Sequence, residues 1–407
     1  MKTLKNLRYD VVCAGGGASG VFAAVAAART GARVLLLERT GFLGGAAALG
    51  MPLRGVAPQH TPLLDEFLCI LTDLGGTAGP LDGPEIPVNG ETVKLAFHRL
   101  CRESGVDVLL YSEAYEVRLC GGAVRGLTAV GKDTLLEVEA PVAIDATGAG
   151  DLARSAGALE QDPPLEACAA LTLTGLEAAE LWHRKKSGAE PGFAKARPGA
   201  RYEGPLTEGG PVCTVYACVE PNRFLVQLPL ACKVDPSDPA SRTRAAVQAH
   251  TKALELLRSL CARSELSAVR LSSVSPQLQL CGAPVVRCAG KSVCGPEQAA
   301  AVTAGRDGRP LYFGVSHLNV PQPAGLLVCG ALAAEHGELE MCIRDSLNVA
   351  HGVWGTARSF CGQLVRRPVI RWSVHRGRRA GRAHVDFPGP RGGQRPKQSA
   401  QTDDRNF

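Results

Sequence analysis

The 407-residue sequence contains no apolar run that approaches the ~20 residues needed to cross a bilayer as a helix. Its first residues, MKTLK, are not followed by the apolar core of a secretion signal. These absences predict a cytoplasmic protein without a membrane partner. With 45% hydrophobic residues, the chain is long enough to bury the cores of two or so domains.

The sequence also lacks any C-x-x-C pair, although it contains 15 cysteines. The nearest spacings, such as Cys213 with Cys218, fit neither a zinc site nor a thioredoxin-like dithiol. We therefore expect no metal site and reduced cysteines that pack as small apolar side chains. The pattern argues against a redox disulfide in the reaction.

Hydrophobic periodicity predicts an α/β fold. Buried strands are expected at 9–14, 33–38, 141–146 and 325–329, with helices at 18–30, 62–74, 92–104 and 241–263. The pattern over 114–140 suggests a small antiparallel meander. We predict a Rossmann-like domain made of residues 1–160 and 265–340, with an inserted α+β substrate domain at 161–264 and a non-native tail at 341–407.

A glycine-rich turn lies between the first expected strand and helix and matches G-x-G-x-x-G. In this motif Gly15 permits the tight turn, Gly17 lets a pyrophosphate approach the backbone, and Gly20 lets the helix pack close to the sheet. Ala18 and Ser19 lie at the helix start, where free N–H groups attract phosphates. The turn therefore predicts a dinucleotide site.

An acidic residue, Glu38, ends the second strand, 18 residues after Gly20. A carboxylate there accepts hydrogen bonds from a ribose 2′-OH and repels a 2′-phosphate. A second glycine pair, Gly44-Gly45, follows closely. Two later strands run into the glycine-containing segments 147–151 and 325–330, which favours FAD over NAD as the dinucleotide.

These motifs resemble those of the FAD-dependent oxidoreductases with a glutathione-reductase-type FAD-binding fold, over roughly residues 8–335. The resemblance implies that FAD is the cofactor and that hydride passes between a small organic substrate and bound flavin. It also implies roles: ribose binding by Glu38, contact with adenine by Arg39 and Ala114, and contact with the rest of FAD by Gly44, Gly45, Thr147, Gly148, Asp151 and Gly330.

No residue is marked clearly as catalytic. His317 is the best candidate for a base and Arg287 for an anion-binding group, ahead of His60, His98 and Lys291. Each of these is also explained as an ordinary surface or packed residue. The rival functions are an NAD-dependent dehydrogenase and a truncated, non-catalytic flavin-binding protein.

Residues 340–346, EMCIRDS, resemble the translation of a sequencing-library adapter. The tail 347–407 contains 12 of the 45 Lys and Arg residues and 3 of the 39 Asp and Glu residues, so its net charge is +9 and that of the remainder is −3. A basic arm for nucleic acid is the competing interpretation. We favour a chimeric tail, no nucleic-acid partner, and an impaired enzyme, since the family's closing glycine- and alanine-rich helix is missing.

The tail's composition cannot bury enough apolar surface to offset the entropy of ordering. We therefore expect limited proteolysis to trim the chain to near residue 340 without loss of bound flavin, measured by mass spectrometry and flavin absorbance. A protease-resistant tail, or loss of flavin on trimming, would show that the tail is a structural element.

Overall fold

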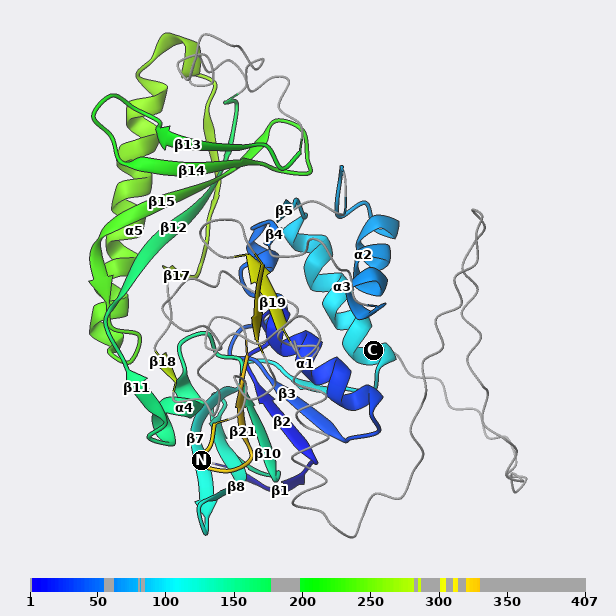
Figure 1. The fold of residues 1–407 in the computed structure, drawn as a ribbon. Helices are drawn as coiled ribbons and strands as arrows, with labels where there is room; N and C mark the ends of the chain where they lie inside the picture. The colour runs from blue at the N-terminus through cyan, green and yellow to red at the C-terminus, as the bar shows by residue number, and fades with distance from the viewer. Residues whose placement is uncertain are drawn as a thin grey trace, which may run out of the picture. The chain divides into compact units, whose positions relative to one another are not determined.

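The computed structural model describes residues 2–54, 62–79, 81, 85–176, 198–281, 285–286, 301–304, 310–313 and 320–329. This part of the chain contains a parallel sheet and a larger antiparallel sheet, each packed against helices (Figure 1). None of its helices is both long and apolar enough to cross a membrane.

The parallel sheet has five strands in the order β21-β10-β2-β3-β6. They are β2 (Val11–Ala14), β3 (Val34–Leu37), β6 (Asp107–Leu109), β10 (Val142–Asp145) and β21 (Leu326–Val328). Strands β2, β3 and β21 are continuous apolar runs because both faces of a parallel sheet are covered. The predicted α/β fold with a parallel sheet is confirmed, and β21 joins it from far along the sequence.

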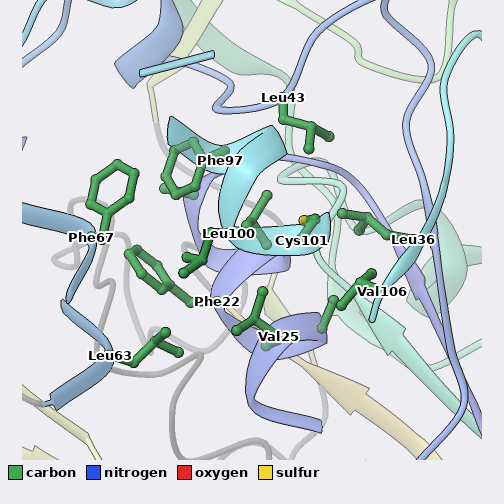
Figure 2. Packing of buried hydrophobic residues seen from close by; sticks show 14 of the residues in the cluster. Phe22, Val25, Leu36, Leu43, Leu63, Phe67, Phe97, Leu100, Cys101 and Val106 are labelled. Atoms are coloured by element: carbon green, nitrogen blue, oxygen red, sulfur yellow. The ribbon is translucent and has the colours of Figure 1, made fainter. Parts of the chain in front are cut away.

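Three helices cover one face of this sheet: α1 (Ala18–Arg29), α2 (Pro62–Asp73) and α3 (Gly90–Glu103). Each contributes one fully buried phenylalanine, and Figure 2 shows these rings together. Phe67 stacks on Phe97 with ring centroids 4.3 Å apart, and the Phe22 ring meets both edge-on. The aromatic contacts fix the three helices against one another.

The other face packs against the short helix α4 (Asp151–Ser155) and a four-stranded sheet in the order β1-β9-β8-β7. These strands are β1 (Lys2–Arg8), β7 (Glu113–Cys120), β8 (Ala123–Val130) and β9 (Thr134–Glu139). The last three form the expected meander. The sequence did not predict β1, which pairs with β9 in parallel.

The antiparallel sheet has the order β13-β14-β15-β12-β16, and β17 also pairs with β12. Its strands are β12 (Leu165–Thr174), β13 (Arg201–Pro205), β14 (Val212–Ala217), β15 (Arg223–Val234), β16 (Arg270–Val274) and β17 (Gln279–Cys281). Helix α5 (Pro239–Cys261) packs an alanine- and leucine-rich stripe against one face. The sheet therefore extends beyond residue 264, the expected end of the inserted domain.

Short elements complete the described chain. They are η1 (Ala47–Leu49), η4 (Ser264–Leu266) and the strand pairs β4 (Leu53–Arg54) with β5 (Glu85–Ile86), β11 (Leu159–Gln161) with β18 (Val285–Val286), and β19 (Ala301–Ala304) with β20 (Pro310–Phe313).

A fully buried carboxylate, Asp145, ends strand β10. It accepts hydrogen bonds from the Thr147 hydroxyl at 2.7 Å, the Thr147 N–H at 3.1 Å and the Ala153 N–H at 2.8 Å. Burial raises the pKa of Asp145 to about 6, although these hydrogen bonds oppose the shift. The carboxylate thus holds the end of the strand, the following loop and α4 together.

Because the pKa of Asp145 is higher in the folded than in the unfolded chain, folding takes up protons, and stability falls as pH rises toward 6. Asp145→Asn removes this dependence. We expect the stability of the wild type relative to Asp145→Asn to fall by about 2 kcal/mol between pH 4 and 7, measured by urea unfolding. A difference that stays constant or grows over this range would contradict the assignment.

Candidate functional site

A cavity of about 230 Å³ opens where the strands of the parallel sheet end. Residues after β2, β3, β6, β10 and β21 all line it, so the carboxyl ends of the strands converge on one place. Ligands of open parallel sheets bind at this edge. The cavity is therefore the candidate site.

The first glycine turn forms the floor of the cavity. Gly15 adopts a left-handed φ of 103°, and a Cβ there would lie 2.3 Å from the Ala146 carbonyl oxygen. A Cβ at Gly20 would lie 1.9 Å from the Gly15 carbonyl oxygen. Glycine is thus required at both positions by the contact between the turn, α1 and the end of β10.

Gly17 differs from these two glycines, because a Cβ there would meet nothing within 4 Å. Gly17 lines the cavity and forms the N-cap of α1, with Ala18 and Ser19 after it. No side chain caps the helix, so its first N–H groups remain available to a ligand. This is the arrangement that a phosphate needs: open space in front of a helix N-terminus.

The second glycine pair packs backbone to backbone against the first turn. The Gly44 N–H donates to the Gly16 carbonyl at 2.7 Å, and a Cβ at Gly45 would lie 3.2 Å from the Gly17 Cα. Gly45 lines the cavity. Gly44 faces the core instead, where a Cβ would lie 2.9 Å from Val93, so Gly44 packs behind the cavity wall and does not line the cavity.

Glu38 is 9% exposed and lines the cavity. Its carboxylate accepts from the Gly16 N–H at 2.6 Å and from the Thr40 N–H at 2.8 Å, one bond to each oxygen. These bonds fix the carboxylate while each oxygen keeps a second lone pair for a ligand. The neighbouring Arg39 forms an exposed ion pair with Glu113 at 3.7 Å.

The loop after β10 forms the opposite wall, with Thr147, Gly148 and Asp151. The Thr147 hydroxyl accepts from the Asp151 N–H at 2.9 Å, which starts α4. Burial raises the pKa of Asp151, while the positive charges of Arg39 and Arg154 oppose the shift. Arg154 donates hydrogen bonds to the Asp151 carboxylate and to the Ala149 carbonyl, which hold this wall in place.

Most of the predicted cofactor residues meet at the cavity. Those that line it are Gly15, Gly17, Ala18, Ser19, Glu38, Arg39, Gly45, Ala114, Thr147, Gly148 and Asp151. Gly20 and Gly44 pack behind its wall. Gly330 and the catalytic candidates His317 and Arg287 lie outside the described residues, as do His60 and Lys291.

His98 is half-buried on α3, does not line the cavity, and has a pKa lowered by burial. Other residues line the cavity without having been predicted, among them Phe42, Ser112, Glu113, Gln277 and Cys329. Ser112 and Glu113 follow β6, and their position after a parallel strand was a usable signal. Gln277 follows β16 of the antiparallel sheet, so no local pattern marks it.

Comparison with known proteins identifies the family of the chain. The family described as FAD dependent oxidoreductase matches residues 10–278. Digeranylgeranylglycerophospholipid reductase 2 of Methanopyrus kandleri is 30% identical over 191 residues, which cover 43% of this chain and 47% of that protein. The Methanothermobacter thermautotrophicus protein of the same name is 33% identical over 174 residues, or 40% and 45% of the two chains. The chain thus matches about half the length of these relatives.

Solved structures show the same fold at low identity. A geranylgeranyl bacteriochlorophyll reductase-like protein from Thermoplasma acidophilum superposes with a TM-score of 0.51 and 16% identity, covering 88% of this chain and 79% of that one. A myxobacterial chondrochloren halogenase gives a TM-score of 0.50 and 13% identity, with coverages of 88% and 77%. The family match extends over more than half of the sequence, and this chain therefore belongs to the FAD-dependent oxidoreductases.

Proposed function

We propose that the cavity holds the adenosine and pyrophosphate of FAD, so that the protein can pass hydride between flavin and a small organic substrate. One observation carries the proposal: the open space at Gly17, in front of an uncapped helix and against Gly45. A pyrophosphate bound there would accept hydrogen bonds from the N–H groups at the start of α1. The family assignment makes FAD the cofactor and does not favour the NAD-dependent alternative.

We assign the adenosine end of FAD to the cavity wall that contains Glu38, on the side opposite α4. The Glu38 carboxylate is held by two backbone N–H groups and has lone pairs left for the ribose hydroxyls. Its negative charge disfavours a 2′-phosphate. Ala114 lines the cavity beside Glu113, which forms an ion pair with Arg39. We assign the adenine ring to the space next to these three residues.

When bound, FAD supplies the hydride chemistry, and the protein positions and shields it. Gln277, on the link between β16 and β17, brings the antiparallel sheet to the same cavity. We therefore place the substrate beside this sheet. His317 as a base, Arg287 as an anion-binding group and Gly330 as a cofactor contact stay predictions from the sequence.

A second, narrower candidate is reduction of carbon–carbon double bonds in a polyprenyl group. It is supported by the names of the relatives from Methanopyrus and Methanothermobacter, which are reductases of digeranylgeranylglycerophospholipid. Anaerobic protein with chemically reduced flavin should be reoxidised by a geranylgeranyl lipid, with saturated product seen by mass spectrometry. Reoxidation by water-soluble enones alone would favour a small substrate. The cytoplasmic location also stays a prediction, and the sequence identifies no electron acceptor or donor.

Gly17→Val tests the phosphate site. Because a Cβ at Gly17 meets no protein atom, the variant should fold normally but fill the space of the pyrophosphate. We expect a folded apoprotein with at least a tenfold weaker affinity for FAD, about 1.4 kcal/mol or more, measured by flavin fluorescence titration. Gly20→Ala is the matched comparison, since its clash with the Gly15 carbonyl should lower stability itself. A fully flavinylated Gly17→Val protein would refute the assignment.

Glu38→Ala tests the ribose site. Removal of a charged hydrogen-bond acceptor should weaken FAD binding by about 1–3 kcal/mol. Glu116→Ala is the control, because Glu116 is exposed on β7 and does not line the cavity. The dissociation constant and the flavin released on denaturation are measured. Unchanged binding in Glu38→Ala, or release of FMN in place of FAD, would contradict the prediction.

A further inference from the structure

Two cysteines that are 113 residues apart in the sequence meet in the antiparallel sheet. The sulfur atoms of Cys168 on β12 and Cys281 on β17 are 3.5 Å apart. Both are free thiols, and neither lines the cofactor cavity. The absence of a C-x-x-C motif had suggested isolated cysteines, but sheet pairing creates a dithiol.

The strand register explains the contact. Cys168 pairs with Gln279, and Cys281 pairs with Glu166, so the two cysteines are diagonal neighbours on one face of the sheet. Ala167 and Ala169 of β12 point to the opposite face and pack in the core with α5. The dithiol therefore lies on the face away from α5, where Cys168 is half-buried and Cys281 is exposed.

The two thiols have different acidities. The hydrogen bond between the two sulfurs lowers the pKa of Cys281 to about 7, even though burial and the charge of Glu166 oppose the shift. The same hydrogen bond raises the pKa of Cys168, together with burial and the charges of Cys281, Glu166 and Cys213. Cys281 is also the more exposed of the two, so we assign the attacking thiolate to Cys281 and the second thiol to Cys168.

We propose that Cys168 and Cys281 form a peroxide-sensitive pair that closes to a reversible disulfide. The Cys281 thiolate attacks hydrogen peroxide, which gives a sulfenic acid on Cys281 and hydroxide. The Cys168 sulfur then attacks that sulfur, and the sulfenic oxygen leaves as water. The two sulfurs lose two electrons in total, and the peroxide is reduced by the same two electrons.

Disulfide formation needs a small rearrangement, because a sulfur–sulfur bond is about 2.05 Å long and diagonal neighbours are farther apart than directly opposed residues. A bond made under such constraint is readily reduced by thiols. It would tie β17 covalently to β12, close to the segment that carries Gln277 to the cofactor cavity. The site does not depend on the assignment of substrate or ribose contacts.

The test uses the full chain loaded with FAD. The protein is treated with hydrogen peroxide, its free thiols are blocked with N-ethylmaleimide, and it is digested with trypsin without reductant. Cleavage after arginine gives peptides 155–184 and 271–287, each of which contains a single cysteine. We expect these two peptides as one disulfide-linked species that dithiothreitol separates. Peptides that stay separate and carry over-oxidised sulfur would overturn the proposal.

Variants distinguish the two roles. In Cys168→Ser, oxidation should stop at the Cys281 sulfenic acid, which dimedone traps, whereas Cys281→Ser should give no adduct on Cys168.

In the untreated protein, Cys281 should react with N-ethylmaleimide at pH 7 about threefold faster than exposed Cys120, because its thiolate fraction is raised. Cys120→Ser is the control and should leave the cross-link unchanged. A dimedone adduct on Cys168 in Cys281→Ser, or equal reaction rates for Cys281 and Cys120, would overturn the assignment.

Discussion

The site depends on the close approach of two glycine turns to each other and to the end of β10. The Gly16 carbonyl accepts from the Gly44 N–H, and the Gly15 and Gly20 positions have no room for a side chain. This backbone contact places the start of α1 at the carboxyl edge of the sheet. Gly15 and Gly20 allow this contact because they carry no side chain, and Gly17 in the same turn leaves open the space that we assign to a phosphate.

Two buried carboxylates then shape the walls, and both are held by backbone N–H groups. Glu38 accepts from Gly16 and Thr40, which ties the first turn to the end of β3. Asp145 accepts from Thr147 and Ala153, which ties the loop after β10 to α4. Backbone donors at fixed positions offset part of the cost of burying charge and orient each carboxylate. The walls of the proposed cofactor site are therefore already organised by the protein itself.

The antiparallel sheet provides two features next to the proposed site. Its link between β16 and β17 supplies Gln277 to the cofactor cavity, and its pairing of β17 with β12 brings two cysteines together. Both features lie within a few residues of each other on the same segment. A change in the redox state of the cysteine pair would therefore act on the part of the sheet that reaches the cofactor.

The sequence by itself determined the parallel sheet, the dinucleotide turn and the place of Glu38, because these follow from local periodicity and from glycine spacing that the backbone dictates. Only the tertiary structure decided that Gly44 faces the core while Gly45 faces the cavity, that Gln277 reaches the site, and that Cys281 meets Cys168. The physical reason is that side-chain direction and strand pairing are set by partners far along the chain. No local window of sequence contains those partners.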